Sequence, residues 1–178
     1  MTHLVLIARL ALAGVLLVSA VAKARAFEDS RTMLDGLLRR IGPRGDRLAR
    51  PATVALIAAE ALTGLALLGP GTTVRVGWVA AAVLTAGFTV LAVVATVTRA
   101  EVSCACFGRP AARLGPRHVV RNAPLLGLAL LGLWGVWAGT APSGYPEAPA
   151  VALCAVTAAV ITAVTAYFDD IADLVVNP

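Results

Sequence analysis

Charged and aromatic residues are scarce in this chain of 178 residues, in which 14% are Asp, Glu, Lys or Arg and 5% are Phe, Trp or Tyr. Soluble domains usually carry about 25% charged residues. Together with 59% hydrophobic residues and a mean hydropathy of +0.85, this scarcity excludes an ordinary soluble domain. The arginines also lack the interleaved aromatic residues of a single-strand-binding platform, so the net charge of +5 does not indicate a nucleic-acid partner.

The sequence also lacks the alternating, turn-punctuated pattern of an outer-membrane barrel, any convincing internal repeat, and any linker that would separate a second domain. It contains instead five apolar stretches, each near the 20 residues that a helix needs to cross a bilayer. These stretches are residues 3–22, 51–69, 74–98, 119–140 and 149–168. We therefore expect an all-α, polytopic transmembrane bundle of about five spans, forming a single integral membrane domain over residues 1–178.

Lysine and arginine are distributed unevenly between the loops. Residues 23–50 hold eight of the 15 basic residues and residues 99–121 hold five, whereas only Arg9 and Arg75 lie elsewhere. Because basic loops are retained on the cytoplasmic side, five spans place the N-terminus outside and the segment near Cys104 inside. An alternative is that the first stretch is a cleaved signal peptide, since residues 20–22 read Ala-Val-Ala.

The first basic loop contains a second kind of pattern. Over residues 30–41, Leu34, Leu37, Leu38 and Ile41 recur at helical spacing, and the following Gly-Pro pair stops the pattern. We expect an interfacial amphipathic helix on the cytoplasmic leaflet, with a docking surface for a partner as the alternative.

Cysteine is also rare, with three residues in the chain. Cys104 and Cys106 are separated by one residue, and such a pair supports two-electron exchange because one thiol attacks a partner's disulfide and the other resolves the mixed disulfide. A Cu(I) or zinc site is the alternative, but no second Cys pair or Cys/His cluster completes a tetrahedral set, so we expect no metal. Cys154 lies near the opposite face and is interpreted as a packing residue.

Two ionisable residues within or beside the apolar stretches require a reason for their position. Glu60 lies about 13 Å along the second span at 1.5 Å per residue, where a carboxyl group is either structural or a proton acceptor. Lys23 is the only lysine, and its four-residue spacing from Ser19 puts both on one face of the first helix. Lys23 is either a boundary anchor or a partner for a thiolate or for an acid such as Glu60.

These positions together carry a resemblance to a known family. The pattern consists of Ser19 and Lys23 ending the first helix, Glu60 and Gly64 in the second, Cys104-Ala105-Cys106-Phe107-Gly108 after the third, and Arg121-Asn122 opening the next. It resembles the MauE branch of the MauE/DoxX redox-associated membrane proteins, roughly over residues 10–134. One departure is visible, since the family element usually has Gly where this chain has Ala105, and Ala narrows the backbone choices for closing a disulfide.

The resemblance implies a DoxX-like four-helix core plus one helix in a bacterial plasma membrane, a thioredoxin-like partner, and a role in maturation of redox proteins. Cys104 and Cys106 are then the catalytic residues of a thiol-disulfide oxidoreductase, supported by Ser19, Lys23, Glu60, Phe107, Gly108, Arg121 and Asn122. Two alternatives stay open: a non-catalytic anchor for a soluble redoxin, and a small-molecule transporter or quinone-linked carrier that uses Glu60. The substrate protein, the electron direction, the use of quinone, the oligomeric state and a re-entrant course for the Cys104 loop are left open by the sequence.

Overall fold

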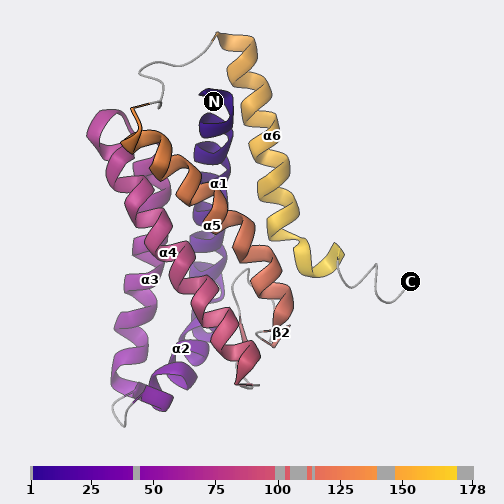
Figure 1. The fold of residues 1–178 in the computed structure, drawn as a ribbon. Coiled ribbons are helices and arrows are strands. Elements are labelled where there is room, and N and C mark those ends of the chain that lie inside the picture. Colours follow the sequence, from indigo (N-terminus) through magenta and orange to yellow (C-terminus); the bar gives the residue numbers. More distant parts are fainter. Residues whose placement is uncertain are drawn as a thin grey trace.

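The computed structural model describes residues 2–41, 45–98, 103–104, 112–113, 115–139 and 147–171. Over these residues it contains six α-helices and one pair of two-residue strands (Figure 1). In chain order they are α1 (Thr2–Arg25), α2 (Phe27–Ile41), α3 (Gly45–Leu68), α4 (Gly71–Val97), β1 (Ser103–Cys104), β2 (Ala112–Arg113), α5 (Pro116–Trp137) and α6 (Ala148–Ala166). Of the described helices, α1, α3, α4, α5 and α6 are long and apolar enough to cross a membrane. The predicted all-α polytopic bundle is confirmed.

The helices extend beyond the apolar stretches that identify them. Helix α3 begins at Gly45, six residues before the stretch that starts at Pro51, and continues through this proline. Hydropathy marks only the part of a helix that suits hydrocarbon, whereas backbone hydrogen bonding continues into the charged flank that contains Arg47 and Arg50. The segment before Pro51 is therefore helix rather than loop.

Helix α1 is the centre of the bundle. It contacts α2, α3, α5 and α6, while α4 completes a ring by contacting α3 and α5. The most apolar window of α1 is 56% buried, compared with 17% for α6, which packs against the outside of α1. The architecture is thus a core of four helices, α1, α3, α4 and α5, with α6 added to one side, and Figure 1 shows α6 beside α1.

Small residues bring the core helices close together. A Cβ atom on Gly64 of α3 would lie 2.8 Å from Leu17 Cγ of α1, and one on Gly132 of α5 would lie 2.1 Å from Trp78 Cη2 of α4. Such contacts are needed in a membrane, where lipid tails are as apolar as the side chains and association depends on close packing. These glycines set the distances between α1 and α3 and between α4 and α5.

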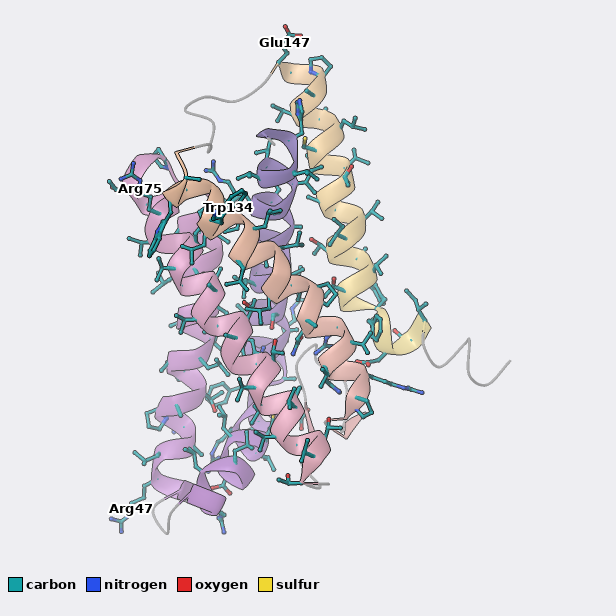
Figure 2. All side chains as sticks on the ribbon, viewed as in Figure 1. Arg47, Arg75, Trp134 and Glu147 are labelled. Carbon is teal, nitrogen blue, oxygen red and sulfur yellow. The ribbon has the colours of Figure 1, made fainter. Side chains whose placement is uncertain are left out.

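The two ends of the bundle differ in their side chains. Figure 2 shows Arg75, Trp134 and Glu147 near one end and Arg47 at the other. Trp134 is 57% exposed and Trp137 is 81% exposed. Tryptophan is enriched at membrane–water interfaces. The two tryptophans therefore mark the interface at the end where α5 finishes and α6 begins.

Arg9 caps the end of α3 at this same end of the bundle. Its Nη2 donates to the Gly69 carbonyl oxygen at 2.7 Å, and its Nε donates to the carbonyl oxygen of Leu67. The last carbonyls of a helix have no partner within the helix and carry partial negative charge, so a guanidinium satisfies both needs. A basic residue within the first apolar stretch thereby ties α1 to α3.

Helix α2 lies at the opposite end and packs on the bundle. Met33 is buried against Ala92 and Ala95 of α4, with Leu34 and Leu37 beside it. The sequence predicted the helix and its apolar face. We expected that face to contact lipid, whereas its side chains contact other helices. The polar face carries exposed ion pairs, Arg31 with Glu28 at 3.0 Å and Arg39 with Asp35 at 2.9 Å; exposed pairs of this kind contribute at most about 1 kcal/mol each.

Candidate functional site

The predicted cysteine pair is described only in part. The backbone of Cys104 lies in β1, opposite Ala112 of the antiparallel strand β2, and β1 contacts α2. The side chain of Cys104 and all of Cys106, Phe107 and Gly108 lie outside the described residues. The strand that carries Cys104 is therefore placed at the α2 end of the bundle (Figure 1), and the proposed exchange between the two thiols stays a prediction.

Ser19, Lys23 and Glu60 form a buried cluster between α1 and α3. Lys23 Nζ donates to Glu60 Oε1 at 2.7 Å and to Glu60 Oε2 at 3.0 Å, and it also donates to Ser19 Oγ. Ser19 Oγ in turn donates to Glu60 Oε1 at 3.2 Å. The side chains of Lys23 and Glu60 are 1% and 0% exposed, so this is an ion pair without contact to bulk solvent.

Helix geometry explains how the cluster assembles. Residues four apart lie on one face of a helix, and side chains lean toward the helix N-terminus, so the Lys23 ammonium reaches back over Ser19. Glu60 is one turn before Gly64, where the absent side chain lets α3 approach Leu17 of α1. The close approach at Gly64 brings the Glu60 carboxylate within reach of both α1 side chains.

All three N–H donors of the Lys23 ammonium have acceptors within this cluster. An ammonium has three donors, and they are directed at Ser19 Oγ and the two oxygens of Glu60, while the Phe88 ring lies 5.4 Å from Nζ. The attraction between buried opposite charges, with every donor satisfied, offsets the large cost of removing both ions from water. Removing one partner would leave a buried charge without compensation.

A serine and a lysine in contact can form a nucleophilic dyad, but this pair is arranged differently. A dyad lysine must be neutral to take the proton of the serine hydroxyl. Here Lys23 donates to the carboxylate of Glu60 and to Ser19 Oγ, and the Ser19 hydroxyl donates to Glu60. The geometry supports an ammonium held by a carboxylate and does not support an activated serine nucleophile.

The cluster borders a cavity of about 40 Å³ inside the four-helix core. One part of its wall is polar and consists of Ser19, Lys23, Glu60, Thr85, Arg121 and Asn122. The remaining wall is apolar, with Leu12 and Leu16 of α1 and Leu125 of α5 among its residues. The cavity thus brings together five side chains that the sequence pattern had singled out on three different helices.

Thr85 and Phe88 of α4 are cavity residues that the sequence reasoning missed. They lie three residues apart and therefore share one face of the helix. Thr85 is 4% exposed, and its hydroxyl donates to the Ala81 carbonyl oxygen at 2.7 Å. Neither residue is ionisable and α4 carries many apolar and small residues, so no sequence signal distinguishes these two from packing residues.

Arg121 links the cavity to the end of α6. Its Nη1 lies 3.5 Å from Asp169 Oδ2, and the two side chains are 5% and 28% exposed. His118, one turn earlier on α5, is 4% exposed, and its Nδ1 accepts from the Gly115 backbone N–H at 3.5 Å. The start of α5 therefore places a buried cation beside the cavity and connects it to a partly exposed carboxylate.

Cys154 lies apart from this site. It is buried in α6, and its Sγ is 4.0 Å from the carbonyl oxygen and from Nδ1 of His3 near the start of α1. Within the described part of the chain it is a free thiol. This confirms its interpretation as a packing residue.

Comparison with known protein families identifies the chain. The family model described as "Methylamine utilisation protein MauE" matches residues 1–135. The protein belongs to the MauE family. No curated protein and no solved structure matches the chain. The match extends from α1 almost to the end of α5, so it includes nearly all of the four-helix core, the cavity wall and the Cys-x-Cys segment, whereas α6 and Asp169 lie beyond it.

Family membership and the five apolar helices together describe a multi-pass membrane protein. A redox-associated role in the membrane is consistent with this family.

Proposed function

We propose that this protein is a membrane thiol-disulfide component that exchanges electrons with a thioredoxin-like partner through Cys104 and Cys106. The observation that carries the proposal is the family match, which includes the Cys-x-Cys segment. In addition, five side chains of the family-like pattern, contributed by α1, α3 and α5, meet at one cavity in the core. They are Ser19, Lys23, Glu60, Arg121 and Asn122. A set of buried ionisable groups around one cavity is more typical of a functional site than of helix packing alone.

The proposed exchange is a reversible transfer of two electrons. A thiolate of one cysteine attacks the partner's disulfide, a mixed disulfide forms and one partner thiolate leaves. The second cysteine then attacks the mixed disulfide, so that the Cys104–Cys106 bond forms and the partner's second thiolate leaves. The partner has gained two electrons and this protein has lost two; the reverse reaction with a partner dithiol restores the starting state.

We place the thiols beside the headgroups of a bacterial plasma membrane, on the cytoplasmic side. Two observations and one rule support this location. Residues 23–50 and 99–121, which hold 13 of the 15 basic residues, connect α1 to α3 and α4 to α5 and include the adjoining helix ends. Strand β1 contacts α2 at this end of the bundle, and basic loops stay cytoplasmic. The partner then approaches from the side of α2, whose exposed face carries charged residues such as Arg31 and Glu28.

A small-molecule or quinone-linked carrier that uses Glu60 is a second candidate, because Glu60 borders the cavity. Size argues against a ring-shaped ligand in this arrangement. The cavity of about 40 Å³ is far smaller than the roughly 150 Å³ of an apolar cavity that binds benzene. A quinone ring would require the helices to separate, whereas thiol exchange at the bundle end does not.

Mixed-disulfide trapping tests the proposal. The variants Cys104→Ser and Cys106→Ser, in lipid nanodiscs, are mixed with oxidised thioredoxin and separated on a non-reducing gel. We expect one single variant to accumulate a mixed disulfide, because the attacking thiol remains and the resolving thiol is gone, and both to lose turnover. The matched control Cys154→Ser should exchange at the wild-type rate. Wild-type turnover in a variant lacking both Cys104 and Cys106 would refute the proposal.

The same variants separate the alternatives in cells. If the protein is only an anchor for a redoxin, loss of both cysteines leaves its pathway intact, while charge changes on the exposed face of α2 abolish it. If it is a carrier, Glu60→Gln abolishes the phenotype and the cysteine variants retain it. Thiol exchange predicts loss of the phenotype when either Cys104 or Cys106 is replaced.

A further inference from the structure

The volume and the lining residues of the polar cavity determine which molecules it can contain. A cavity needs about 10–15 Å³ for one water molecule, and the water needs two to four polar partners. The volume here is about 40 Å³, which fits a small number of water molecules. Glu60, Thr85 and Asn122, which carry a carboxylate, a hydroxyl and an amide, all belong to the wall. The chemistry of the cavity therefore suits water.

Asn122 is the lining group most open to such a water. It is half-buried on α5, and no hydrogen bond joins its amide to another of the described residues. A primary amide offers two donors and an acceptor. Glu60 Oε2 accepts one bond, from Lys23, and so also retains capacity for a water proton. Water between these two groups would satisfy both.

We propose that water in this cavity makes the Lys23–Glu60 pair a proton-exchange site inside the membrane. In the exchange, an N–H bond of Lys23 breaks and its proton passes to Glu60 over the 2.7 Å between Nζ and Oε1. The resulting O–H bond of the carboxyl group can then break, giving the proton to the cavity water. The reverse steps return one proton, so atoms and charge balance over the cycle.

The charged groups around the pair favour release of this proton. Arg121 of α5 also lines the cavity and interacts electrostatically with Lys23. When the pair has given up its proton it carries one negative charge, which the positive charge of Arg121 offsets. Helix α4 contributes Thr85 and Phe88 to the wall, which carry no charge, and His118 and Asp169 interact electrostatically with Arg121.

Under this proposal, the released proton leaves the pair toward the surface past Arg121. Arg121 lies between the cavity and Asp169, whose carboxylate is 28% exposed. These contacts therefore run from the cavity wall to a partly exposed carboxylate just beyond α6. Thiol chemistry has a use for such a site because a thiol must lose its proton before it attacks a disulfide. The inference itself does not depend on the cysteines.

The single lysine of the chain makes the proposal directly measurable. Protein labelled with ¹⁵N at the lysine Nζ has one such resonance, and in lipid nanodiscs its protons can be tested for exchange with water by NMR. We expect exchange in the wild type, and exchange roughly tenfold slower in Asn122→Leu, where the water loses a hydrogen-bonding partner. Absence of exchange in the wild type would overturn the proposal.

Two further variants distinguish an effect of the cavity from misfolding and from effects of substitution elsewhere in the protein. Thr85→Val keeps the side-chain shape but removes a hydroxyl from the wall, so it should also slow the exchange. Thr157→Val makes the same replacement on α6, none of whose described residues lines the cavity, and should leave the rate unchanged. Equal exchange rates in Thr85→Val, Asn122→Leu and the wild type would show that the cavity is not the route.

The experiment is repeated in a variant with both Cys104 and Cys106 replaced by Ser. We expect the Nζ exchange rate to be unchanged there. If the lysine protons do not exchange but thiol turnover is intact, only the proton-exchange proposal is refuted. If no mixed disulfide is trapped but the lysine protons exchange, only the thiol-exchange proposal is refuted.

Discussion

Lys23 and Glu60 illustrate at the scale of single residues how a membrane interior changes the role of charge. On a protein surface such a pair contributes little, because water screens both groups. Here both side chains are buried, all three ammonium donors are used, and the carboxylate also accepts from Ser19. The pair joins α1 to α3, and each buried charge is compensated by the other.

This dependence predicts a strong coupling between two substitutions. Lys23→Met should destabilise the protein by about 3–5 kcal/mol, because it leaves the Glu60 carboxylate buried without its counter-ion. Glu60→Gln should be destabilising for the corresponding reason. The double variant should lose much less stability than the sum of the losses in the two single variants, since no uncompensated charge remains. Unfolding in mixed detergent micelles, analysed as a double-mutant cycle, measures the coupling; additive losses would contradict the buried pair.

Helix packing at the scale of elements depends on where side chains are missing. Gly132 of α5 accommodates the ring of Trp78, which is 1% exposed. Gly127, five residues earlier on the same helix, has no neighbouring atom within 4 Å of the position of an added Cβ. Two glycines of one helix thus have different roles, and the contact between α4 and α5 distinguishes them.

Alanine substitution at these two glycines should have opposite effects. Gly132→Ala should destabilise the bundle by about 1–3 kcal/mol, because the added methyl group overlaps the Trp78 ring. Gly127→Ala should be neutral or slightly stabilising, because alanine favours the helix more than glycine does. Thermal melting in detergent, followed by circular dichroism, compares the two. Equal melting temperatures would show that α4 and α5 do not meet at Gly132.

At the scale of the whole molecule, an odd number of crossing helices puts the two chain ends on opposite sides of the bilayer. Helix α2, the start of α3, the β pair and the start of α5, which carry described residues of the two basic segments, lie at one end of the bundle (Figure 1). The exposed Trp134 lies toward the other end, as do Arg75 and Glu147 (Figure 2), and the exposed Trp137 is the last residue of α5. The charge asymmetry and the aromatic residues therefore describe one consistent axis across the membrane.

Thiol labelling tests this axis directly. In a variant with all native cysteines replaced, Glu147→Cys should react with a membrane-impermeant maleimide in intact cells, because the proposed orientation puts it outside. Arg47→Cys should react only after lysis, since basic flanks stay in the cytoplasm. Arg75→Cys is a second outer position near Trp134 and should match Glu147→Cys. Labelling of Arg47→Cys in intact cells would reverse the proposed orientation, and with it the cytoplasmic placement of Cys104.

Properties that depend on neighbours along the chain were predictable from the sequence alone. Hydropathy over about 20 residues identifies a spanning helix without reference to its partners, and a spacing of four puts Ser19 and Lys23 on one face whatever packs against it. The five apolar helices, the helix of residues 30–41 and the packing role of Cys154 are therefore confirmed. The resemblance also singled out Glu60, Arg121 and Asn122, which line the cavity.

Contacts between distant residues required the tertiary structure. Glu60 meets Lys23 across 37 positions and Arg121 meets Asp169 across 48, and both contacts depend on how each helix is rotated about its axis. Close approaches such as that at Gly64 set those rotations, and no local pattern encodes them. For the same reason the sequence led us to expect the apolar face of α2 against lipid, whereas in the structure Met33 packs against α4. Local hydrophobicity determined which segments are helices, and interlocking side chains decided which polar groups share the core.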